Sequence, residues 1–397
     1  MKYSVSWTRI SLLIMRKILA AIAYFAVLLS VSDLYASDHQ SFERWQNDKF
    51  SMFIHFGLYS HLGGVWDGEP VRQGYSEQIQ SFAGIFSDWY AETANEFKPV
   101  NFNADEIAQL AKDAGMRSIV FTSKHHDGFC MFDTETTGYN SVAMVEGGRD
   151  FVRELSEACA RCGLNFGLYF SLIDWNYPHA YPISSHNADF VTPEHHEFSK
   201  AQVRELLTNY GKIDILWFDF SYPAAPESLP WMKGKGKAEW QSEKLISIAR
   251  ALQPGIIIDN RADMEQDLWT PEQLQVEEWV RHKETGQLVT WEACHTFSGS
   301  WGYYRDEQTW KSPEMLIQML INTVSIGGNL LMNVGPTARG YLDQRAVNAL
   351  DVYAQWMKYN SRSIYGCTMA EPEFKAPKGT VLTQSVDGKR LYDLARK

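Results

Sequence analysis

The 397-residue sequence predicts an α/β fold, a (β/α)8 TIM-like barrel followed by a short and incomplete C-terminal β segment. Short apolar runs alternate with amphipathic helical stretches, which is the pattern of a parallel α/β fold. Each apolar run is followed by a polar or aromatic segment, as expected where barrel strands end on one common face. From Gly366 the pattern changes to prolines and the alternating run 380–383, which predicts short antiparallel strands.

Seven strands can be recognised, and helices are expected between them because apolar residues recur there at three- and four-residue spacing. The strands are expected at 52–56, 118–121, 165–170, 213–218, 255–259, 289–294 and 329–334. The eighth is expected near 275–280 or in the long insert before Asp105. Helices are expected at 105–112, ending at Gly115, and at 151–162, 194–210, 243–252, 313–325 and 344–359.

The first 36 residues have the features of a secretory signal peptide. Arg16 and Lys17 precede the apolar run 18–31, and small residues follow at Ala36 and Ser37. An uncleaved membrane anchor is the alternative, but the run is short and ends at Asp33. We therefore expect a leader at 1–36, a catalytic barrel at 37–365 and a remnant of a β domain at 366–397. The protein would be exported to a periplasm, the extracellular space or a lysosome-like lumen.

Charge and composition favour a neutral ligand. The formal net charge of -11 and pI near 5.5 argue against nucleic-acid binding, and against stable membrane association beyond a possible uncleaved leader. Aromatic residues make up 14% of the chain, with 14 Trp and 19 Tyr, and such rings commonly stack on sugars. A glycan or another neutral small molecule is the expected partner.

The five cysteines do not have the spacing of a zinc site, and in an exported chain at least one stays unpaired. Cys159 and Cys162 could form a redox pair at the end of a helix. Small buried thiols are the favoured interpretation.

The segment 124–129, Lys-His-His-Asp-Gly-Phe, directly follows the strand expected at 118–121. Neighbouring strand residues point to opposite faces, so His125 and His126 can share a ligand only if the strand has become a loop, which Gly128 favours. The cluster indicates a site rather than core packing. A metal site of His125, His126 and Asp127 is one alternative, although adjacent histidines are unusual ligands in barrels.

Asp219 ends an apolar strand, and Trp217 shares its face by the two-residue period. A buried carboxylate is costly unless a site uses it, although capping of a following helix is an alternative role. A glycosidase needs a second carboxyl group. The candidates are Glu272, Glu277, Glu278 and Glu292, which the residues alone do not rank.

Six ordered segments resemble glycoside hydrolase family 29, the α-L-fucosidases, over about residues 47–366. They are 49–57, 124–129, 167–171, 216–219, 300–303 and 327–336. The sequence departs from the family at Phe56, where a tryptophan is common, and in the near absence of a C-terminal β-sandwich. The retained ring at Phe56 should be tolerated.

The resemblance implies a retaining exo-α-L-fucosidase that releases terminal α-L-fucose from glycans or oligosaccharides through a covalent fucosyl-Asp219 intermediate. Asp219 would be the nucleophile, and Glu272, in a Thr-Pro-Glu segment, the acid/base, with Glu278 and Glu292 as alternatives. Asp127 would hold the neighbouring histidines in place. No metal or other cofactor is implied. The residues that would bind the sugar are His55, Glu77, His125, His126, Tyr169, Trp217, Arg261 and Trp301.

Two rival functions remain open from the sequence. A non-catalytic fucose-binding barrel protein would keep the pocket but lack the acid. A metal-dependent barrel hydrolase would use the histidine cluster as ligands.

Overall fold

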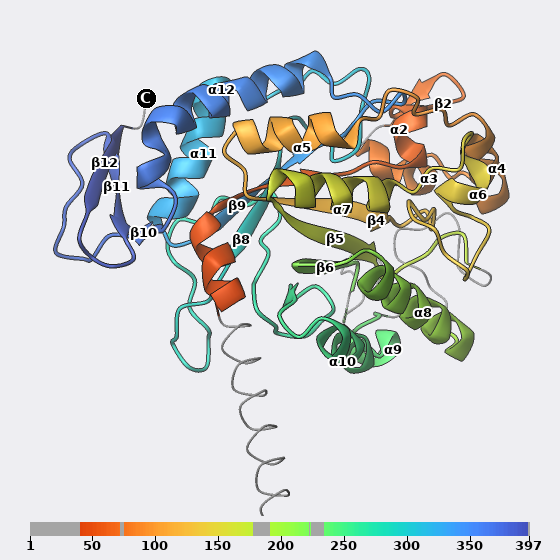
Figure 1. The fold of residues 1–397 in the computed structure, drawn as a ribbon, viewed down its shortest axis with the longest axis horizontal. Coiled ribbons are helices and arrows are strands. Elements are labelled where there is room, and N and C mark those ends of the chain that lie inside the picture. The colour runs from red at the N-terminus through yellow and green to blue at the C-terminus, as the bar shows by residue number, and fades with distance from the viewer. Residues whose placement is uncertain (1–39, 72–74, 178–190, 222, 224–233, 396–397) are drawn as a thin grey trace, which may run out of the picture.

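Seven parallel strands form one curled sheet in the order β7-β6-β5-β4-β1-β9-β8 (Figure 1). The computed structural model describes residues 40–71, 75–177, 191–221, 223 and 234–395. The strands are β1 (Phe50–Ile54), β4 (Ser118–Lys124), β5 (Asn165–Ser171), β6 (Ile215–Asp219), β7 (Ile257–Ile258), β8 (Glu292–Thr296) and β9 (Asn329–Val334). All seven expected strands are confirmed, although β6 and β8 begin later than the apolar runs suggest.

Residues 267–273 close the barrel between β7 and β8. Parallel bridges join Leu268 to Asp259 on one side, and Trp269 and Glu272 to Trp291 and Cys294 on the other. The expectation of an eighth strand at 275–280 or before Asp105 was therefore wrong. Pro271 lacks an N–H and Gln273 has a φ of 49°, so this segment pairs through single bridges rather than a regular ladder.

The six expected helices are confirmed to within about two residues at each end. They are α5 (Ala104–Asp113), α7 (Phe151–Cys162), α8 (Pro193–Asn209), α10 (Ser242–Leu252), α11 (Pro313–Ser325) and α12 (Gln344–Asn360). Local sequence explains their starts: the Asp150 side chain accepts the Arg153 amide before α7, and Ser312 caps α11 with Pro313 at its first position. These helices surround the sheet (Figure 1).

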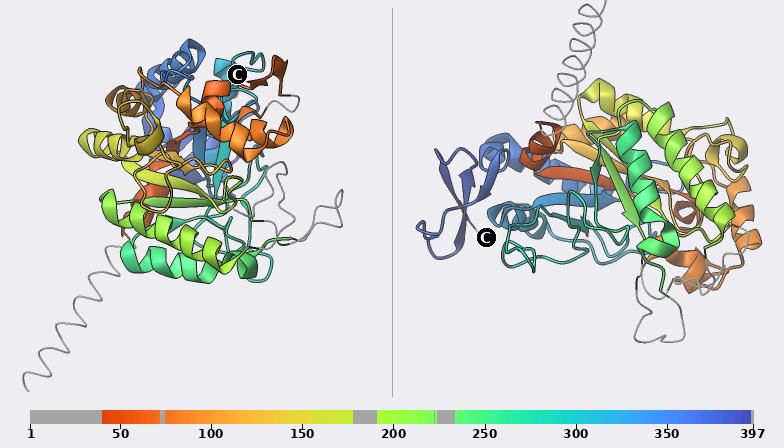
Figure 2. Two further views of the ribbon diagram at one scale, coloured as in Figure 1. Left: turned by 90° about the vertical axis from the view of Figure 1, so that its right-hand side faces the viewer. Right: turned by 90° about the horizontal axis from the view of Figure 1, so that it is seen from below.

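Short elements gather at the end of the barrel to which β4 and β5 point, and Figure 2 (left) looks onto this end. They are α2 (Leu58–Leu62), β2 (Val65–Trp66), β3 (Glu69–Pro70), η1 (Ser76–Gln78), α3 (Ile79–Phe82), α4 (Ser87–Glu92), η2 (Thr93–Asn95) and α6 (Ser141–Met144). A further short helix, α9 (Lys237–Trp240), precedes α10. The long insert before Asp105 thus supplies walls around the strand ends instead of a barrel strand.

Two apolar clusters hold the fold together. The larger fills the space between strands and helices. The smaller lies inside the barrel and includes Phe53, Val120, Ile215 and Leu331, with Trp45 from the helical segment 40–48. The barrel interior is therefore filled by side chains below the strand ends, as in other barrels of this class.

A three-stranded antiparallel sheet follows α12 and η3 (Ser361–Ser363). Its strands are β10 (Cys367–Met369), β11 (Thr380–Ser385) and β12 (Leu391–Ala395), which confirms the antiparallel strands expected in the tail. Figure 2 (right) shows the sheet beside α11 and α12, and Gln318 of α11 donates a hydrogen bond to the Ala395 carbonyl.

Cys159 and Cys162 are free thiols, the first buried and the second half-buried, so they are not a disulfide pair. Within the described ranges, no helix is long and apolar enough to cross a membrane. The leader predicted at 1–36 lies outside the described residues.

Candidate active site

A small cavity opens at the C-terminal ends of the barrel strands. It is lined by all ten residues that the sequence analysis selected, together with Phe53 and Gln78. These ten are His55, Glu77, His125, His126, Tyr169, Trp217, Asp219, Arg261, Glu272 and Trp301. Parallel pairing explains much of this convergence, because Tyr169 is in register with Trp217 and Ser171 with Asp219.

Asp219 lies at the end of β6 and is held in its ionised form. Its Oδ2 accepts a 2.7 Å hydrogen bond from the Tyr169 hydroxyl, and its Oδ1 accepts a 3.1 Å bond from Arg261. Burial opposes ionisation, but Arg261, His126 and Tyr169 outweigh it and keep the pKa of Asp219 below its ordinary value. A carboxylate that stays ionised in a buried position is suited to act as a nucleophile.

Arg261 joins the two candidate catalytic carboxylates. Its Nη1 donates to Asp219 Oδ1 at 3.1 Å and to Glu272 Oε2 at 2.7 Å. Two bonds to Thr270 fix the guanidinium plane, whose centre lies 4.4 Å from the centroid of the Trp217 ring.

Glu272 is positioned by the segment that closes the barrel. The Cys294 amide donates to the Pro271 carbonyl, and the Gln273 amide donates to the Cys294 carbonyl. Glu272 therefore occupies the strand-end position of the missing eighth strand. Its side chain is 44% exposed, at the mouth of the cavity.

The hydrogen bonds of His55 define its tautomer. Asn333 donates its amide nitrogen to the Trp301 carbonyl, so its oxygen faces His55 Nδ1 at 2.7 Å and must accept from it. Burial lowers the pKa of His55 to about 3, which keeps the ring neutral. The other ring nitrogen, Nε2, is thus an acceptor.

The chain turns directly after β4, as Gly128 led us to expect, and both His125 and His126 line the cavity. Gly128 has a φ of 78°, and a Cβ there would lie 2.1 Å from Asp174 Oδ1, so only glycine fits. Asp174 also forms a fully buried ion pair with Lys124 at 3.2 Å. This pair joins the end of β4 to the loop that follows β5.

His126 has a defined orientation too. The Ser171 hydroxyl donates to the Ile173 carbonyl at 2.9 Å, so its oxygen accepts from His126 Nδ1 at 2.7 Å. The opposite nitrogen, Nε2, lies 3.9 Å from Asp219 Oδ2.

The role expected for Asp127 was wrong. Its Oδ2 accepts from the Tyr90 hydroxyl at 2.9 Å and its Oδ1 from the Phe129 amide at 3.1 Å. Asp127 therefore orders the loop and anchors α4 rather than holding the histidines, because the turn at Gly128 directs its side chain toward Tyr90. Throughout the described ranges, no group of three or more His, Cys, Asp or Glu side chains is arranged to hold a metal ion.

Glu77 and Trp301 complete one wall. Glu77 Oε2 accepts from the Ser300 hydroxyl at 3.2 Å and the Gly302 amide at 3.0 Å, while Oε1 has no partner among the described residues. Burial raises the pKa of Glu77 to about 7, so near neutral pH the group can donate or accept a proton. The Trp301 ring lies 5.2 Å from His55 and supplies an apolar surface.

The alternative glutamates lie elsewhere. Glu278 is exposed and does not line the cavity. Glu292 is fully buried near the opposite end of the barrel, at the first position of β8. Phe56, the departure from the family pattern, also lies outside the cavity and stacks on Phe102 in the outer core.

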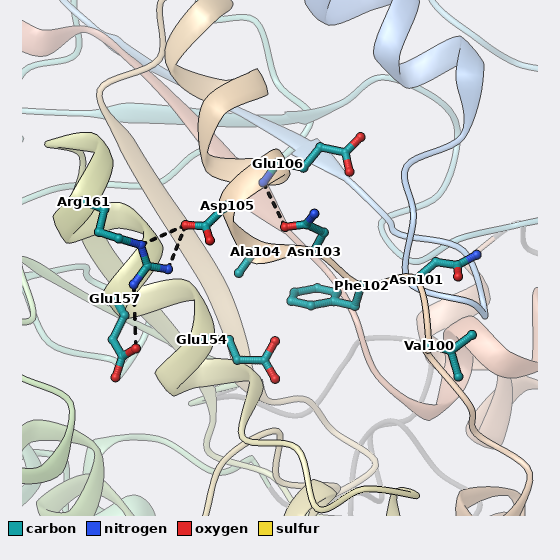
Figure 3. A pocket seen from close by; sticks show the side chains of 10 residues that line it. All are labelled: Val100, Asn101, Phe102, Asn103, Ala104, Asp105, Glu106, Glu154, Glu157 and Arg161. Carbon is teal, nitrogen blue, oxygen red and sulfur yellow. Dashed lines mark hydrogen bonds and ion pairs between the residues drawn. The ribbon is translucent and has the colours of Figure 1, made fainter.

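A more open hollow lies on the side of the barrel between α5 and α7 (Figure 3). Three of its four carboxylates have arginine partners. Arg161 contacts Asp105 and Glu157, and Arg149 contacts Glu154. This hollow shares no lining residue with the cavity at the strand ends and lacks its convergent groups.

Several contributing residues had no role in the sequence analysis. Phe53 could have been found, because it shares a strand face with His55. Asn333, Ser171 and Thr270 act through hydrogen bonds to residues distant in sequence, which no local pattern indicates.

The chain as a whole is similar to known α-L-fucosidases. A family model described as "Alpha-L-fucosidase" matches residues 32–362. Plasma α-L-fucosidase of Homo sapiens is 30% identical over 352 residues, covering 80% of this chain and 68% of that protein. The solved structure of α-L-fucosidase isoenzyme 1 from Paenibacillus thiaminolyticus is 34% identical, with a TM-score of 0.75 over 88% of this chain and 82% of that one.

A second solved structure bears on chemistry. A trapped covalent intermediate of a GH29 α-L-fucosidase from Bacteroides thetaiotaomicron, in complex with 2-fluoro-fucosyl fluoride, is similar to this chain. The two are 25% identical, with a TM-score of 0.75 and coverage of 88% of this chain and 81% of that one.

Proposed function

This chain belongs to the α-L-fucosidase family, glycoside hydrolase family 29, and we propose that it is a retaining exo-α-L-fucosidase acting on terminal α-L-fucose of glycans or oligosaccharides. Asp219 is the nucleophile and Glu272 the general acid and base. The covalent intermediate trapped in the Bacteroides relative supports this type of mechanism.

In the first step, Asp219 attacks the anomeric carbon of the fucoside and the bond to the leaving oxygen breaks. Glu272, protonated, transfers its proton to that oxygen, so that an alcohol leaves and an ester to Asp219 forms. In the second step, water attacks the anomeric carbon, Glu272 takes the proton from the water, and Asp219 departs as a carboxylate. Two inversions give net retention.

The shared contact with Arg261 is the observation that carries the proposal. Asp219 Oδ1 and Glu272 Oε2 lie 3.1 Å and 2.7 Å from the same nitrogen, and their separation cannot exceed the sum of these distances. For these two oxygens the limit is about 6 Å, which is compatible with the ~5–5.5 Å that separates the carboxyl groups of retaining enzymes.

Arg261 also suits the change in role of Glu272. When Asp219 has become an ester it carries no charge, and the guanidinium then faces Glu272 as its one remaining carboxylate contact in the cavity. The 2.7 Å contact with Arg261 then holds Glu272 in place while it takes the proton from water in the second step.

The other lining residues match a neutral deoxy sugar. His55, His125, His126, Tyr169 and Glu77 offer donors and acceptors for hydroxyl groups. Trp301 offers an apolar surface for the methyl group, and Trp217 forms the wall beside the nucleophile. No step in this mechanism uses a metal or another cofactor.

The wider assignments are part of the same proposal. The apolar leader at 1–36 would direct export, the barrel would span 37–365, and residues 366–397 would form a separate β segment. Fucosylated glycans of an exported compartment would be the substrates. The relative named plasma α-L-fucosidase supports this location.

The decisive experiment follows the anomer released first from an aryl α-L-fucoside by proton NMR. We expect α-L-fucose to appear before mutarotation forms the β anomer. Initial release of the β anomer would contradict the mechanism. Binding of fucose without release from any fucoside would instead favour the non-catalytic alternative.

A further inference from the structure

Two aromatic side chains at the start of α4 are exposed side by side. Phe86 precedes the helix and is 51% exposed, and Trp89 lies in its first turn and is 56% exposed. Their ring centroids are 5.5 Å apart and their planes nearly perpendicular. In the described part of the chain, this is the one ring pair in which both members are exposed. Paired exposed rings mark a binding surface more often than an isolated one does.

The helix that carries these rings is fixed to the wall of the candidate active site. Tyr90, the next residue, is buried and donates its hydroxyl to Asp127, which follows His126 in the cavity. The Ser87 hydroxyl donates to the Trp175 carbonyl, and the Trp175 amide donates to the His126 carbonyl at 2.8 Å.

A third contact joins α4 to the opposite wall of the cavity. Gln80 of α3 donates to Ser87 at 3.2 Å, and the adjoining η1 carries Glu77 and Gln78. The ring pair therefore lies on a rigid element at the active-site end of the barrel (Figure 1). A glycan bound by its terminal sugar would extend outward at this end.

The charges around the pair select the ligand class. Residues 86–98 contain Asp88, Glu92 and Glu96, and their one basic residue, Lys98, already pairs with Glu146. Carboxylates accept hydrogen bonds from hydroxyl groups and repel anions. Aromatic faces with acidic neighbours therefore suit a neutral saccharide rather than a sialylated or sulfated one.

We propose that Phe86 and Trp89 form a platform that binds the sugar units beyond fucose in neutral fucosylated oligosaccharides. The inference rests on the proposed function, since it assigns the leaving group of that reaction. It makes the enzyme selective for extended glycans over small fucosides, through binding rather than through the chemical step.

The test compares Trp89→Ala and the double variant Phe86→Ala/Trp89→Ala on two substrates, an aryl α-L-fucoside and a neutral fucosylated pentasaccharide. The KM for the pentasaccharide should rise fivefold or more at unchanged kcat, while kcat/KM for the aryl fucoside stays within twofold. Trp89→Phe keeps a ring and should raise the KM for the pentasaccharide less than Trp89→Ala does. Tyr359→Ala, which removes a ring that is 78% exposed on α12, should change neither substrate. Equal pentasaccharide kinetics in Trp89→Ala and wild type would overturn the platform.

Calorimetry separates this inference from the proposed function. The pentasaccharide and the same glycan lacking fucose are titrated into the full chain carrying Asp219→Asn, with and without Trp89→Ala. Weaker binding of both ligands to Asp219→Asn/Trp89→Ala than to Asp219→Asn supports the platform, even if the wild type cleaved no fucoside. Unchanged affinity for both overturns it, even if the wild type were a fucosidase.

Discussion

Arg261 Nη1 lies 3.1 Å from Asp219 Oδ1, in the cavity at the C-terminal ends of the barrel strands. The charge of Arg261 offsets the burial that would otherwise raise the pKa of Asp219. The ionisation of the candidate nucleophile therefore depends on a residue that is not expected to react. This dependence gives the first of five predictions.

Arg261→Met should raise the pKa of Asp219. Because Asp219 must be ionised to attack, the acidic limb of the kcat/KM profile should move to higher pH, by roughly one unit or more. The measurement is the pH dependence of aryl fucoside hydrolysis. Arg345→Met removes an arginine that pairs with Asp343 outside the cavity and should leave the limb in place. An unshifted limb in Arg261→Met would show that Arg261 does not control Asp219.

Asp219→Gly should lower kcat for an aryl fucoside by roughly 10⁴-fold or more, since the covalent intermediate can no longer form. Added azide should restore turnover by occupying the space of the missing carboxylate, and the product should be β-L-fucosyl azide. Azide should not accelerate the wild type. Substantial activity of the variant without azide would move the nucleophile to another residue.

Glu272→Ala should reduce hydrolysis of fucosides with poor leaving groups by about 10²–10⁴-fold, because such groups need a proton to depart. For substrates with an activated leaving group, the rate of the first step should fall less. Glu292→Gln is the matched control and should keep its activity, since Glu292 does not line the cavity. Full activity of Glu272→Ala together with a large loss of activity in Glu292→Gln would assign the acid role to Glu292.

Ser171→Ala should disturb His126 by removing the acceptor for its Nδ1 proton. We expect kcat/KM to fall about tenfold, in proportion to one lost hydrogen bond of roughly 1.4 kcal/mol. Nitrogen NMR of labelled histidine should show the Nδ1–H tautomer of His126 becoming less populated. Ser123→Ala removes an equally buried hydroxyl that bonds the Tyr169 carbonyl, and it should leave the His126 signals unchanged.

Glu292 should make stability depend on pH. Burial raises the pKa of Glu292 to about 8 in the folded protein, from an ordinary value of 4.5. The stability that Glu292 contributes is therefore complete below its ordinary pKa of 4.5, and it is lost as pH rises through the folded-state pKa of about 8. The melting temperature of Glu292→Gln, relative to wild type, should rise by a few degrees or more between pH 5 and pH 9. Glu373→Gln, at an exposed position, should show no such trend. Parallel curves for Glu292→Gln and wild type would mean that Glu292 ionises freely in the fold.

The sequence was sufficient for the strands, the helices and the chemical types at the strand ends. An apolar run followed by a polar segment has a local physical cause, because a buried strand must emerge at the rim before polar groups can be solvated or used. His55, Trp217 and Asp219 could be assigned to one pocket on this basis. The resemblance to known α-L-fucosidases then indicated which polar groups belong together.

The position of the second carboxylate depended on tertiary structure. Residues 267–273 carry no regular strand pattern, yet they pair with both β7 and β8 and place Glu272 beside Arg261. Glu292 has a stronger strand pattern but begins β8 and is buried away from the cavity. Asp127 likewise turned toward Tyr90 instead of the histidines.

By itself, then, the sequence determined which elements form and which residue types stand at their ends, because hydrophobic period and turn chemistry act between near neighbours. Only the tertiary structure decided which glutamate meets Asp219, which nitrogen of each histidine carries the proton, and how the barrel closes. These features depend on hydrogen bonds and close contacts between residues distant along the chain, such as His55 with Asn333 and Glu272 with Arg261, and such contacts leave no periodic signal in the sequence.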